Sequence, residues 1–136
     1  MSFTISFSEI NWLSVIVVTI LSFALGAFWH SSFLFGKAWK EDVKPDFDEK
    51  KIKFVRLFGL SALFHFIAIA GLDAFIGTNS SLTDGLFKGF FVGLTWVATG
   101  IGVNYLFAQR PLRLLLIDAG YYIVFLSMAG LILGAW

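Results

Sequence analysis

An all-helical protein that crosses a membrane four times is the fold class that this sequence predicts, and three observations predict it. The composition is 58% hydrophobic and 14% charged, with 17 Phe and 5 Trp, which is more apolar surface than a small water-soluble core buries. The apolar residues form four long runs, each near the roughly 20 residues that a helix needs to cross about 30 Å of hydrocarbon. The runs are continuous rather than alternating, which excludes the strands of a membrane barrel.

The predicted spans cover about residues 10–35, 54–77, 85–108 and 112–136. The second helix is expected to begin in water at about residue 46, because Asp46 follows Pro45 as a cap and Glu49 stands at the reciprocal capping-box position. Arg110 and Pro111 form a tight turn before the last helix. Short connections place consecutive helices side by side, so we expect one domain, residues 1–136, folded as an antiparallel four-helix bundle.

Lys and Arg are distributed unevenly among the connections. The first connection and its edge carry seven of them and the third carries Arg110 and Arg113, whereas the opposite side offers Lys88 alone. Because short loops rich in Lys and Arg stay in the cytoplasm, both termini are expected on the non-cytoplasmic side. Five acidic residues nearly neutralise the first connection, which argues against a nucleic-acid partner.

Small residues recur at helical spacing in the last two spans. The stripe in the third span consists of Gly85, Gly89, Gly93 and Gly100, and the fourth span ends with Gly130 and Gly134. Helices in lipid associate through close packing at such residues. The predicted partner of the stripe is either a helix of the same chain or a second subunit.

Polar side chains inside the spans are the candidate functional residues, because such groups are costly in lipid and mark a site or a buried pair. The candidates for binding, or for a proton or ion path, are Asp118, Asn104, His65, His30, Tyr121, Tyr122 and Ser31. Counted from the nearest Lys or Arg, His30, Asn104 and Asp118 lie roughly 7 to 11 Å below the cytoplasmic edge. His65 lies about one turn deeper, so each span offers a polar group to a similar layer.

Such a layer has three chemical interpretations. His and Asp within hydrogen-bond reach relay protons, or the same groups bind a cation or the polar head of a substrate, or they satisfy one another and fix helix register. No metal or cofactor is expected, because the two His and Asp118 lack the spacing of a metal motif and the chain has no Cys. Asp73 is expected near the opposite membrane interface.

The stretch from Trp29 to Trp39 is interpreted as an interface anchor. Trp rings sit at the level of the headgroups, and Lys37 reaches the same plane. The alternative is a functional mouth where the first helix leaves the bilayer.

Two motifs make the chain resemble a known family. Residues 26–39 are Gly-Ala-Phe-Trp-His-Ser-Ser-Phe-Leu-Phe-Gly-Lys-Ala-Trp, and residues 115–122 are Leu-Leu-Ile-Asp-Ala-Gly-Tyr-Tyr. Together with Arg110-Pro111 and residues 130–136, they resemble the bacterial domain of unknown function family 1761 over essentially the whole chain. The resemblance implies a small four-helix protein of the bacterial inner membrane and leaves its activity open. The family pattern often has Tyr at the position of His30, which weakens any mechanism that requires His30 to ionise.

Three functional hypotheses follow. The first is a small transporter or channel subunit, which as a homo-oligomer would place the glycine stripe of the third span at a subunit contact. The second is a non-catalytic subunit that assembles with another membrane protein. The third, an enzyme that uses Asp118 as acid or base on a lipid-soluble substrate, has least support, because no nucleophile with an adjacent base stands out. In each case the lipid bilayer is a partner.

Overall fold

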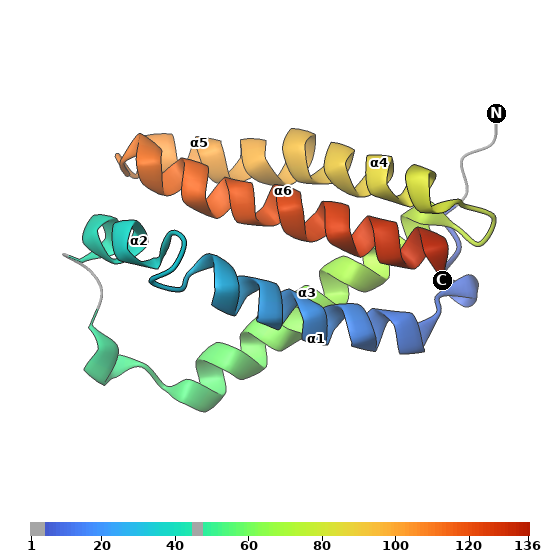
Figure 1. The fold of residues 1–136 in the computed structure, drawn as a ribbon, viewed down its shortest axis with the longest axis horizontal. Helices are drawn as coiled ribbons and strands as arrows, with labels where there is room; N and C mark the ends of the chain where they lie inside the picture. Colours follow the sequence, from blue (N-terminus) through green and yellow to red (C-terminus); the bar gives the residue numbers. More distant parts are fainter. Residues whose placement is uncertain (1–4, 45–47) are drawn as a thin grey trace.

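The computed structural model describes residues 5–44 and 48–136. In this part of the chain, four helical rods are long and apolar enough to cross a membrane. They are α1 (Trp12–Trp29), α3 (Phe54–Ile76), the combined rod Leu82–Phe107 and α6 (Leu112–Ala135). The predicted all-helical class and its four apolar helices are therefore confirmed. α1 begins and α6 ends at one end of the molecule, and the turn between α5 and α6 lies at the other end (Figure 1).

The first helix is shorter than the predicted span. At its start, the side-chain oxygen of Asn11 accepts a hydrogen bond of 3.1 Å from the Ser14 N–H. The Asn11 N–H in turn donates to the Asp73 carboxylate at 2.9 Å, which ties the start of α1 to the last turns of α3. α1 ends at Trp29 rather than at residue 35.

A tight turn replaces the predicted end of this helix. The Phe35 N–H donates to the Trp29 carbonyl at 3.1 Å, and the Gly36 N–H donates to the Ser31 carbonyl at 2.9 Å. A Cβ atom at Gly36 would overlap the backbone carbonyl of His30, so the close approach requires glycine. A short helix, α2 (Gly36–Val43), then folds back toward α6.

The second helix begins later than predicted. The predicted cap at Asp46 lies outside the described residues, and the chain resumes with a short 3-10 turn, η2 (Glu49–Lys51). α3 begins at Phe54, where the membrane span was expected. It ends at Gly77, whose φ of +80° is a conformation that favours glycine. Lys88 Nζ donates to the Ile76 carbonyl at 3.0 Å and satisfies one of the last carbonyls of α3.

The third rod contains a change of helix type. Its segments are α4 (Leu82–Val92), the π-helical η3 (Gly93–Ala98) and α5 (Thr99–Phe107). A capping box at Ser81 and Asp84 starts α4, with both reciprocal hydrogen bonds present. In η3, the Thr95 hydroxyl donates to the Phe91 carbonyl at 2.6 Å and supplements the backbone bonds. The wider π turn inserts about one extra residue, so it rotates α5 relative to α4.

α4 and α6 lie side by side with their backbones in contact (Figure 1). A Cβ atom on Gly85 would overlap the Gly130 carbonyl, one on Gly89 would overlap the Leu126 carbonyl, and one on Gly130 would overlap the Gly85 carbonyl. Gly134 likewise lies against Gly85. Of the two partners that the sequence left open for the glycine stripe, the structure shows the one in the same chain, because Gly85, Gly89 and Gly93 pack against α6. A Cβ atom on Gly100 would have no neighbouring atom within 4 Å, so Gly100 is outside the α4–α6 contact.

The other contacts join α1, α3 and α6 around a small apolar core. Val15 and Val18 of α1, Ile69 of α3, and Phe125 and Ala129 of α6 are fully or almost fully buried. The first half of α3 is outside this core, since every residue from 54 to 60 is exposed. Large exposed apolar side chains surround the molecule, as expected for helices that face lipid.

Replacement of Gly89 by Leu should destabilise the fold, because the larger side chain would push the α4 and α6 backbones apart. Overpacking of this kind costs about 1 to 3 kcal/mol or more. Gly100→Leu is the matched control, since open space surrounds that position. We expect a lower thermal midpoint in detergent for Gly89→Leu and a midpoint near that of the parent for Gly100→Leu. Equal midpoints for the two variants would contradict the α4–α6 contact.

Candidate functional site

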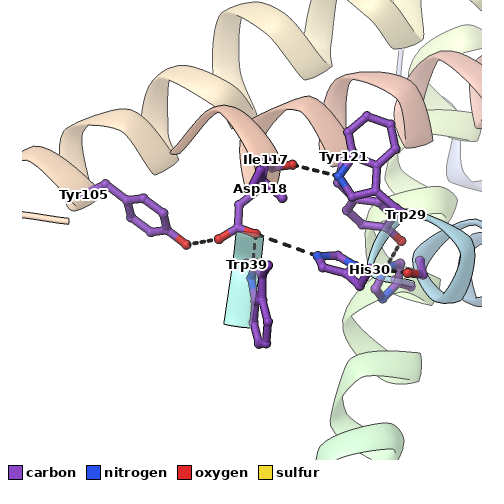
Figure 2. Close-up of polar contacts among 9 residues, drawn as sticks. Trp29, His30, Trp39, Tyr105, Ile117, Asp118 and Tyr121 are labelled. Atoms are coloured by element: carbon purple, nitrogen blue, oxygen red, sulfur yellow. Dashed lines mark hydrogen bonds and ion pairs between the residues drawn. The ribbon is translucent and has the colours of Figure 1, made fainter. Parts of the chain in front are cut away.

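Asp118 of α6 is the centre of a cluster of polar side chains (Figure 2). Its Oδ1 atom accepts a hydrogen bond of 3.1 Å from the Trp39 indole N–H, and its Oδ2 atom accepts a short hydrogen bond from the Tyr105 hydroxyl. Trp39 belongs to α2 and Tyr105 to α5, so one carboxylate joins three helices. The Asp118 side chain is 16% exposed, so it is largely removed from solvent but not sealed.

His30 lies beside this carboxylate at the end of α1. Its Nε2 atom is 3.8 Å from Asp118 Oδ1, and its Nδ1 atom is 3.0 Å from the Gly26 carbonyl. Since a carbonyl only accepts, Nδ1 carries the proton in a neutral ring, and Nε2 then faces the carboxylate without one. A second proton on Nε2 converts this contact into an ion pair, so the charge of His30 and the charge of Asp118 are coupled.

A second polar set lies on the other side of Tyr121. The Tyr121 hydroxyl donates to the Ser22 carbonyl at 3.0 Å and is 3.2 Å from His65 Nε2. His65 Nδ1 is 2.7 Å from the Ser61 carbonyl. Three hydrogen bonds need three hydrogens, whereas a neutral His65 and Tyr121 together supply two. The set is therefore one hydrogen short when both side chains are neutral.

The two sets are connected through the Tyr121 ring. Its centroid is 5.7 Å from that of His30 and 6.4 Å from that of His65. Trp29 closes the back of the cluster, because its indole N–H donates to the Ile117 carbonyl at 3.0 Å and its ring packs edge-on against Tyr121. Figure 2 shows Trp29 of α1, Trp39 of α2 and Tyr105 of α5 around Asp118 and Tyr121 of α6.

The Asp118 cluster forms the wall of a cleft of about 560 Å³. The lining residues are Asp118, His30, four other aromatic residues (Trp39, Tyr105, Tyr121 and Tyr122), and the aliphatic residues Val97 and Ile101. The cleft therefore combines one carboxylate with several aromatic rings. A smaller cavity of about 140 Å³ adjoins His65 and shares Tyr122 with the cleft.

An ion-pair clamp holds α2 in place above the cleft. Arg113 of α6 donates through Nε and Nη2 to the two carboxylate oxygens of Asp42, at 2.9 and 2.7 Å, and Nη2 also reaches Glu41 at 3.3 Å. This bidentate geometry fixes orientation as well as distance. Hydrogen bonding from Arg113 holds the pKa of Asp42 below its ordinary value. Arg113 is five residues before Asp118 on α6. Its contact with Asp42 therefore holds α2 close to Asp118, and α2 carries Trp39.

The structure brings together most of the predicted polar residues and leaves two outside. His30, Asp118, Tyr121 and Tyr122 line the cleft, and His65 contacts Tyr121. Ser31 is not part of the cluster, because its hydroxyl donates to the Phe28 carbonyl at 2.6 Å and satisfies the end of α1. Asp73 lies at the opposite end of α3, where it accepts from Asn11.

Asn104 is exposed, and the expectation that it joins the polar layer does not hold. The physical reason is the π turn in η3. Regular α-helical steps from Gly85, Gly89 and Gly93 lead to Gly100 and Asn104, but one inserted residue moves the inward-facing positions to Ile101 and Tyr105. The sequence analysis therefore did not predict Tyr105 as a residue of the site. The signal in the sequence was the stretch around Thr95, whose hydroxyl bonds to a backbone carbonyl where the helix changes type.

The interface-anchor residues also divide between two environments. Lys37 is exposed on α2, whereas Trp39 is partly buried and donates to Asp118. Within residues 5–44 and 48–136, no three His, Cys, Asp or Glu side chains are arranged to hold a metal ion.

Fold and site together define a class: an all-helical protein with four membrane-compatible helices and a carboxylate-aromatic cleft between them. The family model described as "Protein of unknown function (DUF1761)" matches residues 13–134, and the chain belongs to this family. The resemblance stated from the sequence is thereby confirmed. No curated protein and no solved structure is detectably similar to the chain.

Replacement of Asp118 should separate its hydrogen bonding from its charge. Asp118→Ala leaves the Trp39 and Tyr105 donors without their acceptor, at about 1 to 3 kcal/mol for each. Asp118→Asn keeps both bonds, because its amide oxygen accepts from Trp39 and its amide N–H donates to the Tyr105 oxygen. We expect the thermal midpoint in detergent to fall for Asp118→Ala and to stay near the parent value for Asp118→Asn. Similar midpoints for the two variants would refute this geometry.

The Arg113–Asp42 clamp predicts a pH-dependent stability. Because Arg113 lowers the pKa of Asp42, the ionised carboxylate stabilises the fold above its ordinary pKa near 3.9, and this contribution is lost as the pH falls through the lowered pKa. We expect Asp42→Asn to lower the thermal midpoint at pH 7 and to lose this effect progressively as the pH falls below the ordinary pKa of about 3.9. Glu41→Gln is the control, with a smaller effect at pH 7 because it removes one longer contact. A difference between Asp42→Asn and the parent that is independent of pH would contradict the clamp.

Proposed function

We propose that this protein is a small membrane transport protein that binds an organic cation in the Asp118 cleft in exchange for a proton. The observation that carries the proposal is a carboxylate among aromatic rings at the depth of the membrane-compatible helices. An ionisable group at that depth is by default a functional residue. The cleft, of about 560 Å³, has the size of a small-molecule site.

The chemistry of the lining favours a cation over an anion or a sugar. Aromatic faces attract cations through their quadrupoles, most strongly where water is excluded. Asp118 adds a negative charge, and its two hydrogen bonds leave lone pairs available on both oxygens. Val97 and Ile101 supply apolar surface for the carbon groups of an organic ammonium ion.

Exchange with a proton follows from the position of His30. A bound cation and a proton on His30 each neutralise the charge of Asp118, so each weakens the binding of the other. Cation binding in this scheme releases a proton, which is the elementary step of an antiporter.

The proposed setting is the bacterial inner membrane, with the four helices as an antiparallel bundle and both termini outside the cytoplasm. The supporting observation is the excess of Lys and Arg around α2 and the α5–α6 turn, at one end of the molecule. The Asp118 cleft then opens near the cytoplasmic side. Its lining includes no residue of α4 and none of the second half of α6, so we propose that a homo-oligomer completes the path across the membrane.

The alternative function is that of a subunit that assembles with another membrane protein. It is supported by the hydrogen bonds that Asp118 makes within the chain, since these tie α2, α5 and α6 together whether or not a ligand binds. In that case the charge of Asp118 is dispensable and its hydrogen-bonding shape is not.

Proteoliposomes that contain a pH-sensitive dye test the proposal. With tetramethylammonium added outside, one cation enters for each proton that leaves, so we expect the interior of liposomes with the parent protein to become alkaline. Asp118→Asn keeps the hydrogen bonds but not the charge, and its rate should fall at least tenfold. Asn104→Ala, at an exposed position, is the control and should retain the parent rate. Exchange by Asp118→Asn at the parent rate, or no exchange by the parent protein with tetramethylammonium or guanidinium, would overturn the proposal.

A further inference from the structure

A second hollow lies along the first half of α3, away from the Asp118 cleft. It has a volume of about 460 Å³ and is formed by η2 and the first turns of α3. Its lining includes three basic residues, Lys51, Lys53 and Arg56, followed along the chain by three large apolar ones, Leu57, Leu60 and Phe64. The basic end is called the mouth below, and the apolar part is called the floor. Positive charge and apolar surface are therefore separated along one face of a single helix.

The mouth has the features of an anion site. Lys53 is the N-cap residue of α3, and its side chain makes no capping hydrogen bond to the N–H groups at the start of this helix. These N–H groups and the helix dipole add partial positive charge to that of the three basic side chains. Lys51 has one carboxylate neighbour, Asp48, at 3.9 Å, but both side chains are exposed, so this pair is weak.

The apolar floor continues from the mouth into the membrane region. Leu57, Leu60 and Phe64 follow one another at helical spacing, and the hollow shares Ser61 and Phe64 with the smaller cavity beside His65 and Phe125. From Lys53 to Ala68 the helix rises about 22 Å. One leaflet has about 15 Å of hydrocarbon, so the combined trough exceeds the depth that one acyl chain occupies.

We propose that this trough is a binding site for an anionic phospholipid of the cytoplasmic leaflet. The headgroup phosphate binds Lys53, Arg56 and the α3 N-terminus, and one acyl chain lies along Leu57, Leu60 and Phe64 toward α6. The basic mouth lies at the membrane edge and the apolar floor below it, which matches the polarity of a lipid from headgroup to tail.

A second copy of the chain fits this surface less well. A two-fold contact would bring the same basic mouth of each copy to one interface, and like charges would repel. An acidic soluble peptide would match the mouth but not the apolar floor, which lies within a membrane-compatible helix. Only an amphiphile with an anionic head satisfies both parts.

Lipid retention measured by native mass spectrometry tests the site. The protein is purified in detergent, and dioleoylphosphatidylglycerol or dioleoylphosphatidylcholine is added at equal concentration. We expect the parent protein to retain the anionic lipid at least tenfold better. The double variant Lys53→Gln, Arg56→Gln should lose most of this preference. The control Lys37→Gln, Lys44→Gln, which removes equal charge from α2 and its end, should change it less than twofold.

A third variant separates headgroup binding from tail binding. Leu60→Trp fills the trough without a change of charge, and it should weaken retention of phosphatidylglycerol about as much as loss of the two cations. The variants are at exposed positions, so circular dichroism should show parent helix content. Equal losses in the two charge variants would overturn the site, since they would indicate general surface attraction. Full retention by Leu60→Trp, or equal competition by inorganic phosphate, would also overturn it, since the acyl chain would then contribute nothing.

Discussion

The backbone contact between α4 and α6 is the constraint on which the site depends. Lipid gives apolar helices little reason to associate, so their position is set by how closely their surfaces fit. Gly85 and Gly130 allow each helix to approach the carbonyl groups of the other, and this closeness fixes both rotation and axial register. α5 continues the rod that α4 begins. The register set at Gly85 therefore determines which residue of α5 contacts Asp118, and this residue is Tyr105, twenty positions after Gly85.

The π turn determines which residues of α5 face the site. Between the glycine contact and Tyr105, six residues adopt the wider helix, and the facing positions shift by about one residue. Without the shift, Gly100 and Asn104 would face inward, and the cleft would contain an amide in place of a phenol. With it, Ile101 and Tyr105 line the cleft and Tyr105 binds the carboxylate. A local change in hydrogen bonding therefore selects the chemistry of the site.

These two features explain how much of the molecule was predictable from its sequence. Length and hydropathy identify the four spans, and glycine spacing identifies the α4–α6 surface, because both depend on residue type and on regular helical steps. Asn104 was misplaced because regular steps were assumed through Gly93–Ala98, where the helix changes type. The role of Trp39 was missed for a different reason. The connection that follows Trp29 turns at Gly36 and folds α2 onto α6, where Arg113 contacts Asp42, a residue about seventy positions away in the sequence.

The hydrogen bonds around Asp118 explain how a carboxylate can be retained beside lipid and still be available to a ligand. A buried carboxylate without partners is costly, and two neutral donors reduce that cost without cancelling the charge. Had an Arg or Lys been the partner, the charge would be neutralised permanently and a cation would gain little. His30, at 3.8 Å, is a partner whose charge depends on a proton, so it neutralises Asp118 in one protonation state and not in the other. His30 also packs against Trp39 and donates to the Gly26 carbonyl, so a cluster that only fixes helix packing uses it as well. The proposed transport role differs from a packing role in one property, because it requires the charge of Asp118 and not only its hydrogen-bonding shape.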